Sequence, residues 1–184
     1  MCYYRRKGGD TLEKYLPDIY QKSIYTIDYS KLLSRGIKCI LFDLDNTLVP
    51  THENEAPTKA KDLIISLKQK GFKVLIFSNS PKRRVKKFQK YFGLDAIHFA
   101  CKPFQNKFKK AIKDTGYNLN EIAIIGDQIL TDVAGGNKAG ITTILVNPIS
   151  NKGHLFFKVG RFIERKKIKK LRDKDLFCKG RYYD

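Results

Sequence analysis

The sequence lacks any long apolar run, so no segment has the roughly 20 consecutive apolar residues that a transmembrane helix needs. The positive charges near Met1 are not followed by the apolar core of a secretion signal, which predicts a cytoplasmic protein. Internal repeats and low-complexity linkers are also missing. One globular domain with short flanks is therefore the simplest organisation.

Cysteine is scarce and scattered: Cys2, Cys39, Cys101 and Cys178 lie far apart. No two of them have the close spacing of a zinc knuckle or a redox motif, so we expect reduced thiols. Cys39 and Cys101 fall in apolar stretches, and we expect both in the core.

Acidic residues are few, with 18 Asp and Glu against 37 Lys and Arg and a formal net charge of +19. This excess predicts an anionic partner such as a membrane surface, nucleic acid or a phosphorylated substrate. The alternative, that the lysines only form a solvated surface, stays open. The 42% hydrophobic and 30% charged residues are typical of a folded globular chain rather than a disordered one.

From Ile37 to Val146, short apolar runs alternate with longer amphipathic segments. Each run has the length of a strand and is rich in β-branched or aromatic residues, as buried parallel strands are. This alternation predicts a doubly wound α/β domain with right-handed crossovers. The five expected strands cover residues 37–42, 72–77, 96–100, 122–125 and 142–146.

The segments between the strands predict four helices, the last over residues 131–139. The apolar faces of the first three carry Ala60, Leu63, Ile64 and Leu67, then Val85, Phe88 and Tyr91, then Phe104, Phe108, Ala111 and Ile112. We assign one domain to residues 1–150. Its flank, residues 1–36, contributes a short helix and extended pieces that pack on the core, and residues 151–184 form a basic C-terminal tail.

Carboxylates follow two of the expected strands. Asp43 and Asp45 come directly after the first strand, and Asp127 follows the fourth. If the strand order is 3-2-1-4-5, the three converge in the crevice where such folds bind ligands, and their oxygens suit Mg²⁺. The alternative is local: aspartates favour turns, Asp127 can cap the next helix, and Asp132 resembles a first-turn residue that complements the helix dipole.

Groups suited to a phosphate end the other two strands. Ser78, Asn79 and Ser80 precede a helix that begins near Pro81, where a hydroxyl and backbone N–H groups can cradle an anion. Lys102 lies at the end of the third strand and can neutralise phosphate charge. Taken singly, the serine is equally an N-cap, and a single lysine among so many is more often a solvated surface residue.

Together these residues resemble the four ordered motifs of the haloacid dehalogenase (HAD) superfamily: Asp43-Leu44-Asp45-Asn46-Thr47, Ser78-Asn79, Lys102-Pro103 and Gly126-Asp127…Thr131-Asp132. The resemblance implies a phosphatase in which Asp43 is the nucleophile and Asp45 the acid/base. It implies that Thr47, Ser78, Asn79 and Lys102 bind the phosphoryl group. Mg²⁺ would be held by Asp43, the Asp45 backbone carbonyl and Asp127, with Asp132 in support.

The spacing of these motifs predicts an open site. Residues 48–77 have room for one loop, one helix and a strand, and residues 79–101 have room for one helix and one strand. Neither gap holds the cap domain with which many HAD relatives enclose small substrates. A large or surface-presented substrate, or a partner that completes the lid, is expected.

The N-terminal flank extends the resemblance. Leu16-Pro17-Asp18-Ile19-Tyr20, Ser23 to Asp28 and Gly36-Ile37 are similar to the YqeG family, which is related to phosphatidylglycerophosphate phosphatases. This implies phosphatidylglycerophosphate as the substrate and contact with the inner face of an anionic membrane. The mixed apolar and basic stretch from Phe156 to Leu171 can lie at such a surface or form a helix that docks on the core.

Two alternatives stay open. One is a cytosolic phosphatase for a nucleotide or sugar phosphate. The other is an RNA- or ribosome-binding protein on a phosphatase fold, which the charge favours but which lacks a recognisable RNA-binding motif.

Overall fold

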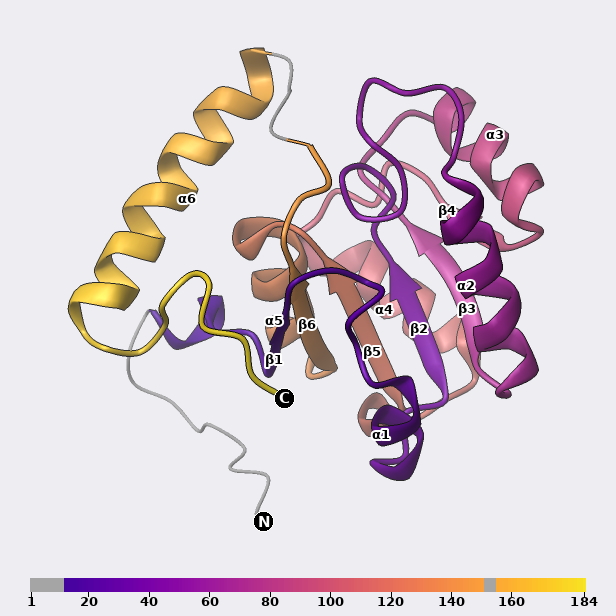
Figure 1. Ribbon diagram of the computed structural model, residues 1–184, viewed down its shortest axis with the longest axis horizontal. Coiled ribbons are helices and arrows are strands. Elements are labelled where there is room, and N and C mark those ends of the chain that lie inside the picture. Colours follow the sequence, from indigo (N-terminus) through magenta and orange to yellow (C-terminus); the bar gives the residue numbers. More distant parts are fainter. Residues whose placement is uncertain (1–11, 151–154) are drawn as a thin grey trace.

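The computed structural model describes residues 12–150 and 155–184, and side chains from Phe162 onward in the second range. Its centre is a six-stranded sheet in which every strand pair is parallel (Figure 1). The strands are β1 (Ile19–Gln21), β2 (Cys39–Phe42), β3 (Lys73–Phe77), β4 (Asp95–Ile97), β5 (Ile122–Gly126) and β6 (Thr142–Val146), in the order β1-β6-β5-β2-β3-β4. The predicted order of five strands is confirmed, and β1 adds a sixth at the edge beside β6.

The register aligns the carboxyl ends of the three central strands. Phe42 of β2 lies beside Ile76 of β3 on one side and Ile125 of β5 on the other. The residues that follow these strands therefore meet along the edge of the sheet that is formed by the carboxyl ends of its strands. Every β2 side chain is buried, as expected for a strand covered by helices on both faces.

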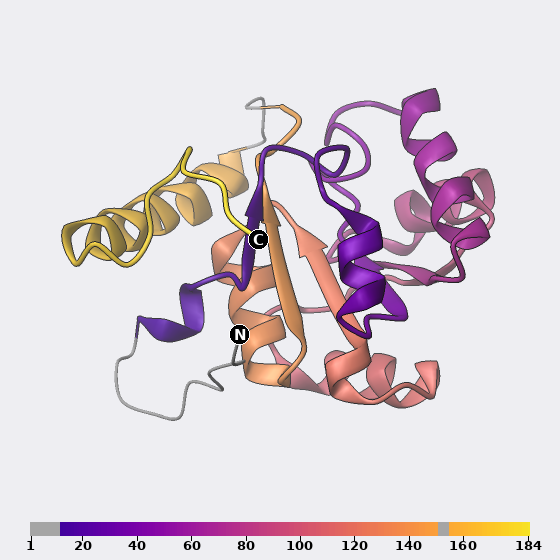
Figure 2. The ribbon, with the colours of Figure 1, turned by 60° about the horizontal axis from the view of Figure 1, so that its bottom comes forward.

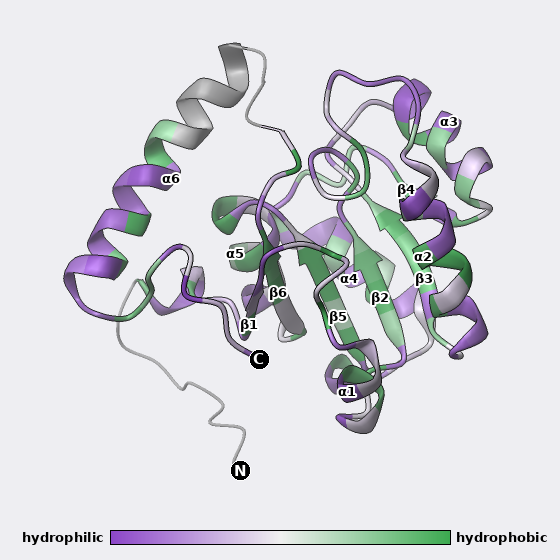
Figure 3. Ribbon diagram, in the orientation of Figure 1, coloured by the Kyte–Doolittle hydropathy of each residue, from purple (hydrophilic) through white to green (hydrophobic). Residues whose placement is uncertain are grey.

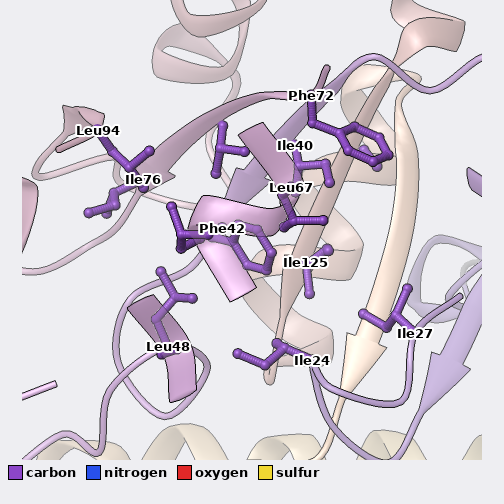
Figure 4. Packing of buried hydrophobic residues seen from close by; sticks show 14 of the residues in the cluster. Ile24, Ile27, Ile40, Phe42, Leu48, Leu67, Phe72, Ile76, Leu94 and Ile125 are labelled. Atoms are coloured by element: carbon purple, nitrogen blue, oxygen red, sulfur yellow. The ribbon is translucent and has the colours of Figure 1, made fainter. Parts of the chain in front are cut away.

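Helices cover both faces of the sheet. On one face, α1 (Tyr29–Ser34), α2 (Thr58–Gln69) and α3 (Lys82–Phe92) share one cluster of buried side chains with Phe42 and Ile76. Figure 4 shows Leu67 of α2 among the strand residues of this cluster. On the other face lie α4 (Gln105–Thr115) and α5 (Ala134–Ala139), where the Phe77 and Phe108 rings are 4.7 Å apart. Three short helical turns are also present in the described chain: η1 (Glu13–Tyr15), η2 (Leu119–Glu121) and the π-helical η3 (Ile129–Val133).

Three expectations about buried side chains are wrong. Tyr91 is exposed and Phe92 is buried instead, so the inner face of α3 carries Val85, Phe88 and Phe92. The spacing did not separate Tyr91 from Phe92, because residues three and four positions after Phe88 both lie on the same side of a helix as Phe88. Phe104 is exposed because it precedes the first turn of α4 rather than lying on its inner face. Cys101 is exposed in a loop, whereas Cys39 is buried as expected.

The two flanks meet beside β1. Tyr20 of β1 and Tyr183 exchange two backbone hydrogen bonds of 2.9 Å, and Leu12, Leu16, Leu171 and Phe177 pack in one cluster with Tyr20. The described part of the N-terminal flank, from residue 12, contains two short helical elements, η1 and α1, and the strand β1. Met1 to Lys7, including Cys2, lie outside the described residues, as does Lys152.

The C-terminal basic segment forms a long helix, α6 (Leu155–Asp173), which lies outside the layered body beside η1 (Figure 2). The part of α6 from Phe162 onward is mainly hydrophilic, in contrast to the strands (Figure 3). Its last turns dock on the body through Leu171 and Ile168, while Phe162 and Ile163 are exposed. The side chains of 156–161, part of the stretch expected to dock or to lie at a membrane, are outside the described residues.

A search of the described helices finds none with the length and apolarity needed to cross a membrane.

Candidate active site

The site begins where β2 ends. The backbone N–H of Asp43 still belongs to the sheet, donating to Ile125 O at 2.9 Å, and the chain then turns sharply. Asn46 adopts a left-handed φ of 64°, which asparagine tolerates better than most residues, and its N–H donates to Val49 O at 2.7 Å. This turn keeps Asp43, Asp45 and Thr47 buried at the same edge of the sheet.

Lys102 links two of the predicted acidic residues. Its Nζ donates to Asp43 Oδ1 and to Asp132 Oδ1, both at 2.6 Å, and all three side chains are buried. Burial alone lowers the pKa of Lys102, but the charges of Asp132 and Asp43 outweigh it and raise that pKa overall. The lysine is therefore a fixed positive charge in the site rather than a solvated surface residue.

Asp43, Asp127 and Asp132 form a buried carboxylate cluster. One oxygen from each lies within 4.8 Å of the others. Burial raises the pKa of Asp43 to about 7, and the nearby negative charges of Asp132 and Asp45 add to the rise that Lys102 opposes. Three carboxylates against one lysine leave negative charge in excess, and hard oxygen donors are the ligands that a divalent cation prefers. The residues present therefore fit such a cation.

Gly126 makes room for this cluster. A side chain at Gly126 would lie 2.2 Å from Asp132 Cγ, so only glycine permits Asp132 to reach the site. Asp132 Oδ2 also accepts from the Gln128 N–H at 3.2 Å. The sequence predicted Asp132 as a supporting residue, and the geometry places one of its carboxylate oxygens within 4.8 Å of oxygens of both Asp43 and Asp127.

Asp45 points to a different partner. Its Oδ1 accepts from Arg84 Nε at 2.7 Å and its Oδ2 accepts from the Ser80 hydroxyl. The two other guanidinium nitrogens of Arg84 donate to Glu53 O at 3.0 Å and Pro50 O at 3.1 Å. Arg84 thus fixes the predicted acid/base to the loop that follows it.

Sequence reasoning did not single out Arg84, which is one of 37 basic residues. A weak signal was available. Arg84 lies three residues after Pro81, in the first turn of the helix that follows the predicted phosphate loop.

Of the four predicted phosphate-binding residues, Thr47, Ser78 and Lys102 have side chains buried at the site, whereas Asn79 bonds to the backbone of Lys102. Thr47 and Ser78 are buried, and Thr47 Oγ1 has no hydrogen-bond partner within the described part of the chain. Asn79 instead braces the loop that carries Lys102: its Oδ1 accepts from Lys102 N at 2.7 Å and its Nδ2 donates to Lys102 O at 3.2 Å. The structure therefore brings Asp43, Thr47, Ser78 and Lys102 to one edge, with Asn79 positioning the lysine's backbone.

No inserted domain covers this edge. The chain between Thr47 and Ser78 forms a loop, α2 and β3, and the chain between Ser78 and Lys102 forms only α3 and β4. The expectation of a capless fold is confirmed.

Comparison with known proteins agrees with this site. A family model for haloacid dehalogenase-like hydrolases matches residues 40–102, and a HAD-hydrolase-like model matches residues 99–148. The chain is 38% identical over 160 residues to "Probable phosphatase YqeG" of Bacillus subtilis (strain 168), covering 87% of this chain and 93% of that protein.

Two more distant similarities are weaker evidence for what this chain does. The chain is 26% identical over 144 residues to "Phosphatidylglycerophosphate phosphatase 1, chloroplastic/mitochondrial" of Arabidopsis thaliana, which covers 73% of this chain but only 41% of that protein. The structure of a predicted HAD-like family hydrolase from Porphyromonas gingivalis superimposes with a TM-score of 0.53 at 16% identity, covering 70% of this chain and 98% of that one. That likeness shows the fold alone. Motifs, fold and the YqeG match together establish that the chain belongs to the HAD superfamily of phosphatases, in the YqeG family.

Proposed function

We propose that this protein hydrolyses a phosphate monoester with Mg²⁺ through an aspartyl-phosphate on Asp43. The observation that carries the proposal is the buried cluster in which Asp43 lies beside Lys102 and within 4.8 Å of two further carboxylates. Such a cluster is costly to bury, and its charges are those that a phosphoryl group and a divalent cation would balance.

Each residue has a proposed role. Asp43 attacks phosphorus, the bond from phosphorus to the leaving oxygen breaks, and Asp45 supplies the proton to that oxygen. Asp45 then takes a proton from the water that releases phosphate and restores Asp43. Lys102, Thr47 and Ser78 bind phosphoryl oxygens, with Asn79 holding the lysine loop in place.

Mg²⁺ would be held by Asp43, Asp127 and the Asp45 backbone carbonyl, with Asp132 in support. When bound, it supplies positive charge beside the transferring phosphoryl group. Lys102 already pairs with Asp43 and Asp132, so this chain's own contribution is a fixed cation that holds the nucleophile in place.

We propose phosphatidylglycerophosphate, a phosphorylated lipid headgroup, as the substrate. The Arabidopsis relative carries that activity in its name, although this chain spans less than half of its length. The capless edge and the net charge of +19 also suit a headgroup presented at an anionic membrane. The basic segment 151–184 would add peripheral contact with the inner face of that membrane.

The test compares phosphate release from phosphatidylglycerophosphate vesicles and from soluble monoesters, with Mg²⁺ or EDTA, for wild type and Asp43→Asn. Release from the lipid that needs Mg²⁺ and is lost in the variant supports the proposal. Faster release from nucleotide or sugar phosphates, unaffected by vesicles, keeps the chemistry but removes the lipid. No variant-sensitive release, together with steeply salt-dependent RNA binding, would favour the RNA-binding alternative.

A further inference from the structure

Two aromatic side chains stand exposed beside the buried lysine of the site. Phe99 is 50% exposed and Phe104 is 70% exposed, which makes Phe104 the most exposed large hydrophobic residue of those described. They lie three residues before and two residues after Lys102, whose own side chain is buried. A single loop thus carries both the buried charge and the exposed rings.

Backbone hydrogen bonds tie these rings to the catalytic edge. Phe99 N donates to Ser80 O at 3.1 Å, and Phe104 N donates to Cys101 O at 2.8 Å. Ile149, 44% exposed, is attached across the site, where its N–H donates to Asn46 O at 2.9 Å. We call Phe99, Phe104 and Ile149 the apolar rim.

The backbone of the loop that carries Phe99 has an unusual conformation. Phe99 has a φ of +46° and Cys101 a φ of +53°, a region that side chains other than glycine, asparagine and aspartate rarely adopt. Strained conformations of this kind persist where the surrounding structure enforces them, and they concentrate at functional sites.

Positive charge accompanies the rings. Lys82 in the first turn of α3 and Lys107 in the first turn of α4 are exposed. Lys107 follows the loop that carries Phe99 and Phe104, and Lys82 follows the neighbouring loop, in which Ser80 O accepts from Phe99 N. The exposed acids of this edge, Glu53 and Glu55, lie on the loop between Pro50 and Pro57 instead. The side of the site that presents Phe99 and Phe104 is therefore both apolar and basic.

We propose that the apolar rim inserts into an anionic lipid surface, which then covers the capless site and presents a phosphorylated headgroup to Asp43. The inference rests on the proposed phosphatase function and deepens it by naming the surface that meets the substrate. Exposed aromatic side chains next to lysines are the combination that binds a membrane interface, since the rings enter the acyl boundary while the lysines pair with anionic headgroups. The overall charge of +19 complements such a surface.

The first experiment measures binding without turnover. Full-length Asp43→Asn protein is sedimented with phosphatidylglycerol-containing vesicles and with pure phosphatidylcholine vesicles. We expect binding to the anionic vesicles, and the added changes Phe99→Ser and Phe104→Ser should lower the partition coefficient by about tenfold or more.

The matched control is Leu119→Ser. Leu119 is 39% exposed, but it lies on η2 before β5, at the opposite edge of the sheet. It tests whether the loss of any exposed apolar side chain weakens binding, and we expect a change below about twofold. Equal losses in the control and the rim variant, or no loss in the rim variant, would overturn the proposal.

The second experiment separates docking from chemistry. In the active protein, Phe99→Ser with Phe104→Ser should leave release from p-nitrophenyl phosphate within about twofold of wild type, while release from vesicle-embedded phosphatidylglycerophosphate falls as binding falls. If wild type releases phosphate from neither, the proposed function fails, and the sedimentation result still decides the docking proposal. If the rim variant keeps vesicle binding but loses binding to single-stranded RNA, the rim is a base-stacking surface and the lipid proposal is wrong.

Discussion

The two ends of the sheet each hold a lysine–carboxylate pair with the same separation. Before β2 and β5, Lys38 Nζ lies 2.6 Å from Glu121 Oε1, and after β2, Lys102 Nζ lies 2.6 Å from Asp43 Oδ1. The side chains of the first pair are 56% and 16% exposed, whereas those of the second are 2% and 9% exposed. The two ion pairs therefore have the same length, but the first lies at the solvent-exposed surface and the second in the interior.

The difference in burial means that the two ion pairs contribute differently to stability. Water and salt screen the first pair, so its removal costs little. The second pair has lost its hydration, and each of its charges depends on the others for compensation. Arg84 and Asp45, with side chains 20% and 9% exposed, lie between these extremes. Stability at the carboxyl end of the sheet is thus coupled to the charges that the chemistry needs.

The largest effect is expected from Asp43→Asn. Phosphate release should fall at least about a thousandfold because the nucleophile is lost. In EDTA the variant should nevertheless unfold at a higher temperature than wild type, by about 2–5 °C, because asparagine removes a buried charge while Asp132 still pairs with Lys102. Calorimetry and a phosphate-release assay on the same samples check both parts. A variant less stable than wild type in EDTA would contradict this account of the site.

Lys102→Gln should break the buried pairs directly. Asp43 and Asp132 would face each other without their cation, so we expect a loss of about 3–5 kcal/mol in the free energy of unfolding. Turnover should fall at least about a hundredfold. Urea unfolding at neutral pH in EDTA measures the first quantity, and an unfolding midpoint equal to that of wild type would show that the pairs do not hold this edge together.

Arg84→Gln should lower kcat/KM for soluble monoesters by about 10–100-fold, because Asp45 loses the group that fixes its carboxylate. The matched control is Arg83→Gln, since Arg83 is the preceding residue of the same helix and is exposed. We expect the control to stay within about twofold of wild type. A similar loss in both variants would mean that α3 contributes through its general charge rather than through the contact with Asp45.

A smaller effect is expected from pH. The folded-state pKa of Asp43 is raised from its ordinary value to about 7, so the folded protein binds this proton more tightly than the unfolded chain does. The resulting stability is fully present below about pH 4 and is lost as pH rises through about 7. In EDTA, wild type should therefore lose about 1 kcal/mol or more between pH 4 and pH 8 relative to Asp43→Asn, by urea unfolding. Parallel pH profiles for the two proteins would sink this assignment.

The smallest effect should come from Lys38→Gln at the other end of the sheet. The exposed pair with Glu121 should contribute little, so we expect a melting temperature within about 1 °C of wild type and unchanged turnover. Measuring the melting temperatures of Lys38→Gln and Lys102→Gln together compares the exposed and the buried ion pair directly. A large loss of stability in Lys38→Gln would remove the distinction between the two ends.

The sequence was sufficient to predict the sheet and the convergence of the site. Buried parallel strands are marked by their apolar runs, and a doubly wound order 3-2-1-4-5 places the residues after the first and fourth expected strands together, so the meeting of Asp43 and Asp127 could be foreseen. The place of Lys102 in the site was implied by the resemblance to the HAD motifs. β1 was not recognised as a strand, because three residues are too few to set a pattern. Its pairing with β6 is decided by packing between distant segments.

The features that sequence reasoning missed depend on loop conformation. Cys101 was expected in the core because it lies in an apolar stretch, but it is exposed in a loop where Phe99 and Cys101 both have positive φ, a conformation that sequence periodicity does not predict. Phe104 was expected on the inner face of the third helix, but that helix begins one residue after it. Arg84 acquires its role from two carbonyls and a carboxylate supplied by a distant loop. In the sequence Arg84 is one of many basic residues, and only the folded structure shows that it contacts Asp45.

The pairing of Tyr20 with Tyr183 has a consequence for aggregation. An edge strand offers unpaired N–H and C=O groups to any other chain, and proteins guard such edges by covering them. Here the cover comes from a segment more than 160 residues away in sequence, reinforced by the bond from the Tyr183 hydroxyl to Pro17 O at 3.0 Å. Contacts between residues so far apart in sequence form more slowly than local ones, so we expect the edge of β1 to be covered late in folding. Until then β1 can pair with a strand of another molecule. At high protein concentration, a substitution that loosens the C-terminal segment should therefore increase aggregation.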